Sequence, residues 1–137
     1  MKRQFPGLYQ QQEPVSPPEG WFRVRIVRAS YVRRAKPFYE IRFRILEPAA
    51  QAGDSFTGRL YCTTKALWKL LWFLQAFGYN LEMLHKDEVN DHALIGLSGV
   101  VRVSHTRIDT RSFLNLDAFE PEMRWVEFAP RLIAGAS

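Results

Sequence analysis

Two stretches of the chain alternate apolar side chains with charged ones, and this alternation constrains the fold more than any other feature. The stretches are residues 22–26 and residues 39–45. Their charged members are Arg23, Arg25, Glu40, Arg42 and Arg44. A period of two places successive side chains on opposite faces of an extended strand. The pattern therefore predicts two half-buried strands, each with an apolar inner face and a largely arginine outer face.

The remaining elements are predicted from shorter patterns. Residues 55–62 are expected to form a third strand, with Phe56, Leu60 and Cys62 on its apolar side and Thr57, Arg59 and Tyr61 on the other. Cys62 is therefore expected to be a small buried hydrophobic residue. Two further strands are predicted at residues 100–104 and 113–119, joined by a loop at residues 105–111.

One helix is predicted between the third and fourth strands. Thr63 or Thr64 can cap its start, and Gly78 fits the position just past its end. Four leucines recur inside it at helical spacing, namely Leu67, Leu70, Leu71 and Leu74. Because tryptophans accompany them, the helix is apolar nearly all round. We expect it to plug the mouth of a barrel.

Three strands, a helix and two more strands follow the connectivity of a five-stranded OB barrel, whose helix lies between strands 3 and 4. The expected fold class is therefore mainly β, with an OB-fold domain at residues 20–121. Residues 1–19 contain three consecutive glutamines and four prolines, which predicts an extended N-terminal arm. Residues 122–137 are expected to be a C-terminal tail.

Positive charge is concentrated in the first half of the chain. Residues 1–72 contain thirteen lysines and arginines against five acidic residues, whereas residues 73–137 contain six against nine. Arginine outnumbers lysine by fourteen to five. A guanidinium binds phosphate through two hydrogen bonds and stacks on flat rings, which an ammonium cannot do. This distribution favours a nucleic acid as the partner, although a basic surface can also serve only solubility.

Other features of the sequence indicate the cellular compartment in which the protein is expected. A single cysteine excludes an intramolecular disulfide and a multi-cysteine metal site, so a reducing, cytoplasmic compartment is expected. No apolar run approaches the roughly 18 residues of a membrane span, and the N-terminus lacks the apolar stretch of a secretory signal. We therefore expect no membrane partner.

The spacing of glycines and apolar residues resembles a known family. The segments that carry the resemblance are Gly20-Trp21-Phe22-Arg23-Val24, Gly58-Arg59-Leu60, Phe77-Gly78, Leu97-x-Gly99-x-Val101-x-Val103 and Asn115-Leu116-x-x-Phe119-x-Pro121. From Gly20 to Pro121 the chain is similar to phage-type OB-fold single-stranded DNA-binding-like proteins, which are encoded beside phage replication and recombination genes. The resemblance implies a role in one of these processes, in a bacterial or phage-infected cell. The acidic tail of many phage single-strand binders is replaced here by residues 131–137.

The outward residues of the first three predicted strands form the main candidate site. Cations along a backbone path and flat side chains for base stacking are what a single-strand groove requires. Arg102 joins the site if its strand lies on the same side, and two basic loops are expected to close over the ligand. The candidate residues are Arg23, Arg25, Arg33, Arg34, Lys36, Arg42, Arg44, Arg59, Tyr61, Arg102, Arg107, Arg111 and Phe113.

Three functions remain open at this point. The first is a non-catalytic, largely sequence-independent binder of single-stranded DNA, with RNA as a second ligand and no cofactor or metal. The second is an OB-fold interaction subunit of a larger nucleoprotein complex, docking a protein or a second copy through the Trp-rich helix or the C-terminal tail. The third is a small nuclease that uses residues 85–92, whose histidines and carboxylates lack a fixed ligand spacing. The first is preferred, because no active-site motif is present.

Overall fold

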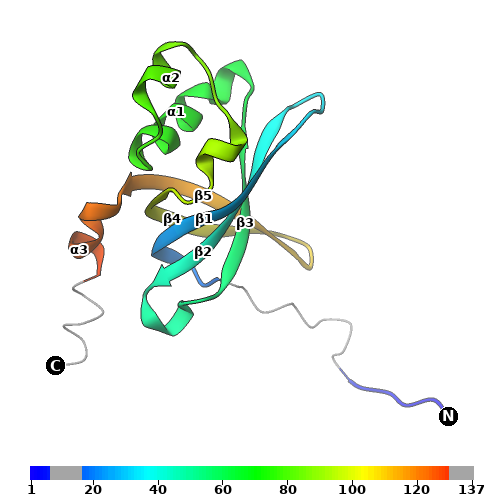
Figure 1. The fold of residues 1–137 in the computed structure, drawn as a ribbon. Helices are drawn as coiled ribbons and strands as arrows, with labels where there is room; N and C mark the ends of the chain where they lie inside the picture. Colours follow the sequence, from blue (N-terminus) through cyan, green and yellow to red (C-terminus); the bar gives the residue numbers. More distant parts are fainter. Residues whose placement is uncertain (7–16, 130–137) are drawn as a thin grey trace.

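The computed structural model describes residues 1–6 and 17–129, and its centre is one five-stranded antiparallel sheet with the order β3-β2-β1-β4-β5 (Figure 1). The strands are β1 (Gly20–Val32), β2 (Phe38–Glu47), β3 (Ser55–Tyr61), β4 (Ser98–Ile108) and β5 (Arg111–Pro121). Helix α1 (Leu67–Ala76) lies between the third and fourth strands. The mainly β fold and the position of its helix are confirmed.

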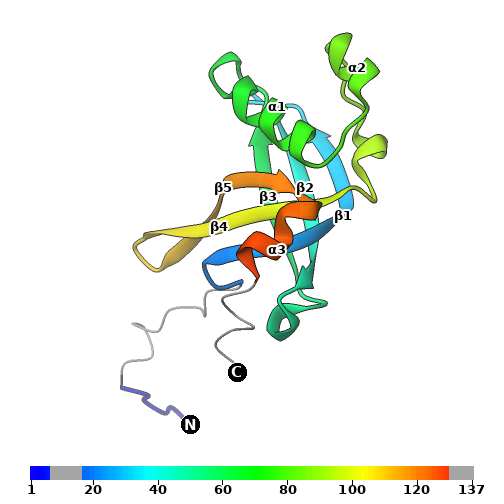
Figure 2. The same ribbon diagram turned by 90° about the vertical axis from the view of Figure 1, so that its left-hand side faces the viewer.

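β1 is the central strand and pairs with both β2 and β4. The two outer strands of the order, β3 and β5, nevertheless approach each other across the core. A Cβ added at Gly58 of β3 would lie 2.7 Å from Cδ1 of Leu116 on β5. The close approach follows from the strong curvature of the sheet, which both views show (Figure 2).

The predicted alternation of the strands is confirmed, apart from three points at which the strand pairing shifts. Phe22, Val24 and Ile26 of β1 are fully buried, and in β3 every second residue is buried. Between Ile26 and Arg28 the pairing with β2 shifts by one residue, which marks a β-bulge. A bulge places two residues of one strand opposite one of its neighbour. The side chains of β1 beyond the bulge therefore change face relative to strict alternation.

Helix α1 covers the open end of the sheet with one side only. Leu70, Phe73 and Leu74 are buried, whereas Leu67 is 47% and Leu71 is 44% exposed. The expectation that four leucines fill the core is therefore wrong for two of them. Phe77, just past the helix, completes the buried stripe with the spacing 70, 73, 74 and 77. This spacing is that of a single helix face.

The boundaries of the helical region differ partly from those predicted. Residues 64–66 form a 3-10 turn, η3 (Thr64–Ala66), and Thr63 precedes it without a side-chain capping bond. The residue before α1 is Ala66, so the predicted threonine cap is wrong. Gly78 does lie just past the helix, with a φ of +75° that favours glycine.

The segment after α1 is held by two asparagine caps. Helix α2 (Leu81–His85) follows Asn80, whose side chain accepts a hydrogen bond from the Met83 amide at 3.0 Å. The 3-10 turn η4 (Asp91–Leu94) follows Asn90, whose side chain accepts one from the His92 amide at 3.0 Å. Leu94 is fully buried in the core. Met83, Leu84 and Val89 are partly buried against the same core, so the segment packs at the end of the sheet through several apolar side chains.

β4 and β5 are longer than predicted. The expected loop at residues 105–111 is wrong, because the two strands continue to pair from His105↔Leu114 to Ile108↔Arg111. Asp109, with a φ of 57°, lies in the turn between them. The result is a long hairpin that projects from the sheet (Figure 1).

The chain after β5 returns to the sheet. The 3-10 turn η5 (Glu122–Arg124) and the short helix α3 (Trp125–Phe128) pack over β1 and β4 (Figure 2). Trp21 and Phe128 stack with their ring centroids 4.2 Å apart, and Trp125 packs against the buried Val100. Residues 122–129 of the predicted tail therefore belong to the folded body, and residues 130–137 lie outside the described residues.

Part of the predicted N-terminal arm is also attached. His105 Nε2 lies 2.6 Å from the carbonyl oxygen of Pro17, and the Glu19 carboxylate accepts a hydrogen bond from the His105 amide at 3.1 Å. Residues 7–16 of the arm lie outside the described residues. No helix in the described part of the chain is long and apolar enough to span a membrane.

Candidate nucleic-acid interface

The outward side chains of β1, β2 and β3 lie in four rows across the sheet. We call them the arginine face. The residues of each row are direct partners on neighbouring strands. In the first row, for example, Arg25 pairs with Arg44, which pairs with Ser55. The rows are Arg25–Arg44–Ser55, Arg28–Arg42–Thr57, Ser30–Glu40–Arg59 and Val32–Phe38–Tyr61. Arginines thus fill two of the three positions in each of the first two rows and one position in the third, and the fourth row contains a valine and two aromatic rings.

The arginines of this face are free of carboxylate partners. All five are exposed, and none forms an ion pair within the described residues. Glu40 is the one acidic residue among the twelve of the face. Cations without acidic partners keep their full attraction for an external anion. The face is therefore suited to contact several phosphates at once.

Two of these arginines are held in place by neighbours. Arg42 donates hydrogen bonds from Nε and Nη2 to Ser55 Oγ at 3.2 and 2.9 Å. The guanidinium carbon of Arg59 lies 4.4 Å from the ring centroid of Phe38, a cation–π contact. Tyr61, which is 39% exposed, lies beside the same ring with centroids 5.4 Å apart. A base can reach Tyr61 next to the Arg59 guanidinium.

Arg23 differs from the other predicted residues, because its guanidinium is already paired. It donates from Nε to Glu47 Oε1 at 2.9 Å and from Nη1 to Glu122 Oε2 at 3.0 Å. The other Glu47 oxygen accepts from Trp125 Nε1 at 2.7 Å. Arg23 thus attaches η5 and α3 to the sheet, and we leave it out of the interface that we propose.

Arg102 is exposed on β4 but is separated from the arginine face. It pairs in register with Trp21, which is stacked beneath Phe128 of α3. Val100, two residues before it, is buried beneath Trp125. Arg102 lies on the same outer side of the sheet as Arg25, but α3 covers the part of β1 and β4 between them, so we leave Arg102 out of the interface that we propose.

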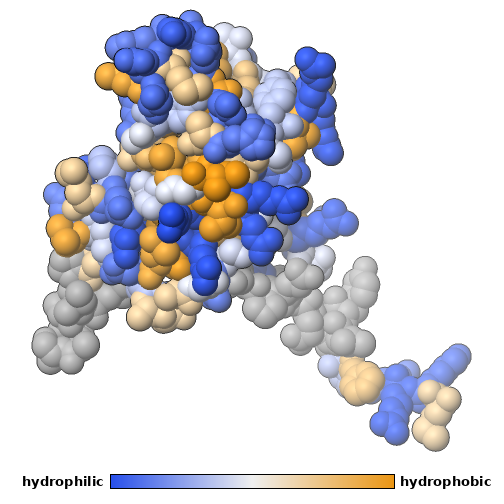
Figure 3. Space-filling model, viewed as in Figure 1, coloured by the Kyte–Doolittle hydropathy of each residue, from blue (hydrophilic) through white to orange (hydrophobic). Residues whose placement is uncertain are grey.

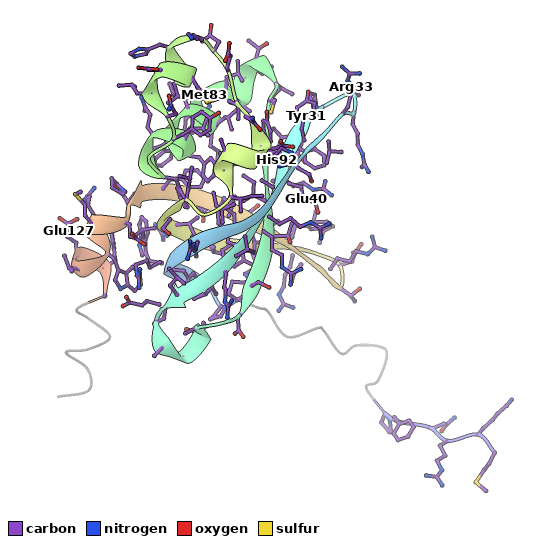
Figure 4. The ribbon with its side chains drawn as sticks, viewed as in Figure 1. Tyr31, Arg33, Glu40, Met83, His92 and Glu127 are labelled. Carbon is purple, nitrogen blue, oxygen red and sulfur yellow. The ribbon has the colours of Figure 1, made fainter. Side chains whose placement is uncertain are left out.

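The basic loops predicted to close over a ligand lie on two separate hairpins. Arg33, Arg34 and Lys36 are exposed at the turn between β1 and β2, with Arg33 at the tip (Figure 4). The β4–β5 hairpin contains the other predicted residues, which are Arg107, Arg111 and Phe113. All three are exposed, and Phe113 is 48% exposed. Arg34 also approaches the arginine face, since its guanidinium carbon is 6.0 Å from the Phe38 ring centroid.

Sequence reasoning missed Arg28. Strict alternation from Ile26 places residue 28 inward, but the bulge turns it outward, opposite Arg42. Val27 is 41% exposed as a result. The available signal was an arginine at a position where alternation requires an apolar residue.

Two hollows lie on or beside the arginine face. One is lined by Arg28, Ser30, Glu40, Arg42 and Thr57 and has a volume of about 340 Å³. The other lies between Arg25 and Arg44 and includes the exposed side chains of Val27 and Ile95. Figure 3 shows apolar surface near the middle of its view with hydrophilic side chains around it. The arginines that line the hollows can contact phosphates, and the apolar side chains of Val27 and Ile95 can contact bases.

A third hollow is apolar and belongs to α1. Leu67, Trp68 and Leu71 line it from the helix, and Tyr31 and Tyr39 line it from the β1–β2 hairpin. Trp68 is 64% exposed and stacks on Trp72 with centroids 6.1 Å apart.

Burial raises the pKa of Tyr39 to about 12 and also raises the pKa of the Cys62 thiol. Cys62 packs against the core but is only half-buried. It is therefore less buried than the sequence predicted. A thiol whose pKa is raised is a poor nucleophile at neutral pH.

Residues 85–92 contain the histidines and carboxylates of the third candidate function. Within the described residues, no three or more histidine, cysteine, aspartate or glutamate side chains are grouped closely enough to hold a metal ion. His85, Asp87 and His92 are exposed to solvent at the surface of the α2–η4 segment.

Comparison with known proteins adds no family assignment. No protein-family model and no curated protein matches this chain.

Proposed function

We propose that this protein binds single-stranded DNA on the arginine face and catalyses no reaction. The observation that carries the proposal is the set of five exposed arginines on three adjacent strands, none paired with a carboxylate in the described residues. Single strands bind through cations along the backbone and aromatic rings under the bases. Tyr61 supplies an exposed ring, and the Arg59 guanidinium, which lies over the buried Phe38 ring, supplies a flat cation beside it.

We further propose that the sheet closes as an OB barrel. Three features support this: the order β3-β2-β1-β4-β5, the approach of Gly58 to Leu116, and the position of α1 across one end. In an OB barrel, a strand face and its flanking loops bind oligonucleotides. The resemblance to phage single-strand binders supports a role in replication or recombination in a bacterial cytoplasm, with RNA as a second ligand.

The proposal is tested by fluorescence anisotropy with labelled single-stranded and duplex DNA at two salt concentrations. Single strands should bind more tightly, with a site of about 4–16 nucleotides. The logarithm of affinity should fall against the logarithm of salt by about 0.7 for each phosphate contacted. A preference for duplex, or an affinity that salt does not change, contradicts the proposal.

A double variant locates the site. Arg42→Ala with Arg44→Ala should weaken binding and flatten the salt dependence, since both side chains are exposed on the arginine face. Lys65→Ala with Lys86→Ala is the matched control, because it removes two exposed cations from outside this face. Equal loss in both double variants indicates attraction by net charge alone.

A second function is favoured by the outer side of α1. Leu67, Trp68 and Leu71 are exposed together beside an apolar hollow, and tryptophan is enriched at the energetic centres of protein interfaces. Under this alternative the barrel is an interaction subunit, and the purified protein shows little affinity for oligonucleotides. The same titration therefore distinguishes the two functions.

A further inference from the structure

Glu40 lies in the middle of the arginine face. In register it stands between Ser30 of β1 and Arg59 of β3. It lines the hollow of about 340 Å³ whose other walls are Arg28, Ser30, Arg42 and Thr57. Figure 4 shows Glu40 on the β1–β2 hairpin, below Tyr31 and the tip residue Arg33. A carboxylate is thus the central polar group of a surface that is otherwise cationic.

The arginines nearest to Glu40 in the register are engaged elsewhere. Arg42 donates two hydrogen bonds to Ser55 Oγ. The Arg59 guanidinium lies over the Phe38 ring, with its carbon 4.4 Å from the centroid. Within the described residues Glu40 forms neither an ion pair nor a side-chain hydrogen bond. Its carboxylate therefore remains available as a hydrogen-bond acceptor at the hollow.

We propose that the hollow holds one nucleobase and that Glu40 selects bases with an exocyclic amino group over uracil and thymine. The proposal rests on the function proposed above. A carboxylate accepts a hydrogen bond from the cytosine amino group. Uracil and thymine present a carbonyl oxygen at the same position, which a carboxylate repels. Arg28 and Arg42 lie beside the hollow and can contact the phosphates that flank the base.

The test compares two probes that differ at one ring position, where cytosine has an amino group and uracil has a carbonyl oxygen. Oligo(dC) and oligo(dU) of about 12 nucleotides fit one barrel and lack the thymine methyl group. The wild-type protein should bind oligo(dC) about tenfold more tightly than oligo(dU) at neutral pH, as expected for one good base contact. In Glu40→Gln this ratio should fall toward one, because an amide can donate to the uracil carbonyl as well as accept from cytosine.

Overall affinity should rise in Glu40→Gln, since a negative charge is removed from among the phosphates. Glu82→Gln on α2 removes an exposed carboxylate from outside the arginine face; it is the control and should leave the ratio unchanged. A modified oligonucleotide tests the same contact with the wild-type protein, in case Glu40→Gln does not fold. Oligonucleotides of N4,N4-dimethylcytosine lack the donor hydrogens, so the wild-type protein should bind them about as weakly as oligo(dU).

The outcomes separate this inference from the proposed function. If both probes bind with salt-dependent affinity but equally well, or if the ratio is the same in wild type and Glu40→Gln, the selection by Glu40 is overturned and the DNA-binding function stands. If neither probe binds, the proposed function and the inference fail together.

Discussion

Arg28 reaches the arginine face because β1 contains an extra residue at Val27. Without the bulge, the alternation that buries Ile26 would direct Arg28 toward the core. An unpaired guanidinium in an apolar core is strongly unfavourable. The bulge therefore resolves a local conflict, and it adds a cation opposite Arg42.

Arg28→Ala should lower the affinity for single-stranded DNA and reduce the salt slope by about 0.7, the effect of one lost phosphate contact. The fold should be unaffected, because the side chain is exposed. Anisotropy titrations at several salt concentrations measure both quantities. Lys86→Ala serves as the control, and an unchanged slope in Arg28→Ala would remove this residue from the interface.

Tyr39 makes the free energy of unfolding depend on pH in the alkaline range. Burial favours its neutral form and raises its pKa to about 12 from an ordinary value of 10. The folded state therefore retains this proton more tightly than the unfolded state. The resulting stabilisation is fully present below the ordinary pKa and is lost as pH rises from about 10 toward 12.

We expect the free energy of unfolding to fall over that range, and to fall less steeply in Tyr39→Phe. Urea melts at several pH values measure the slope, with Tyr61→Phe as a control at an exposed tyrosine. Identical slopes for wild type and Tyr39→Phe would contradict the assignment.

Gly99 of β4 has no room for a side chain. An added Cβ would lie 2.7 Å from Cδ1 of the buried Phe77 ring. Gly99→Ala should therefore lower the free energy of unfolding by about 1–3 kcal/mol, the usual cost of overpacking a core. Thermal melts provide the measurement. The neighbouring half-buried Ser98→Ala should change stability much less, and equal effects would show that the β4 backbone shifts freely.

At the scale of elements, α1 has two apolar sides with different roles. One side packs Leu70, Phe73 and Leu74 onto the sheet, and Phe73 contacts the rings of Phe43 and Phe119 at centroid distances of 6.2 and 5.4 Å. The other side leaves Leu71 exposed. A helix that is apolar all round is ordinarily buried all round. The exposed side is therefore a surface that the sheet alone does not use.

Leu70→Ala should lower the free energy of unfolding by about 2–5 kcal/mol, from lost burial and the cavity left behind. Leu71→Ala should change it by less than about 1 kcal/mol, because the side chain is 44% exposed. Thermal melts of the two variants give the comparison. Equal costs at both positions would mean that the outer side of α1 is covered in solution by another molecule.

At the scale of the whole molecule, the tryptophans lie away from the arginine face. Trp68 and Trp72 belong to α1, whereas Trp21 and Trp125 lie at the packing of α3 on the sheet. DNA bound to the arginine face should therefore change tryptophan fluorescence only slightly. A partner docked on α1 should change it strongly.

Fluorescence titration with oligo(dT) checks this expectation, with anisotropy reporting binding in parallel. Quenching that disappears in Trp68→Phe would place the DNA on α1 instead of the arginine face.

The strands and most of the candidate site could be predicted from local pattern. Arg25, Arg42, Arg44 and Arg59 lie on the outward face as the alternation indicates, because the two-residue period of a strand is a property of the backbone itself. Periodicity contains no information about what covers an outward position. For that reason the engagement of Arg23 with Glu47 and Glu122 could not be predicted.

The sequence by itself determined the mainly β class, the position of the helix and the sign of the charge on the outer face, since each depends on residues close together in the chain. Only the tertiary structure decided the rest. It decided that a bulge adds Arg28, that α3 covers the sheet between Arg102 and the arginine face, and that α1 buries Leu70 while exposing Leu71. These outcomes depend on contacts between residues far apart in sequence, where packing and ion pairing override the local pattern.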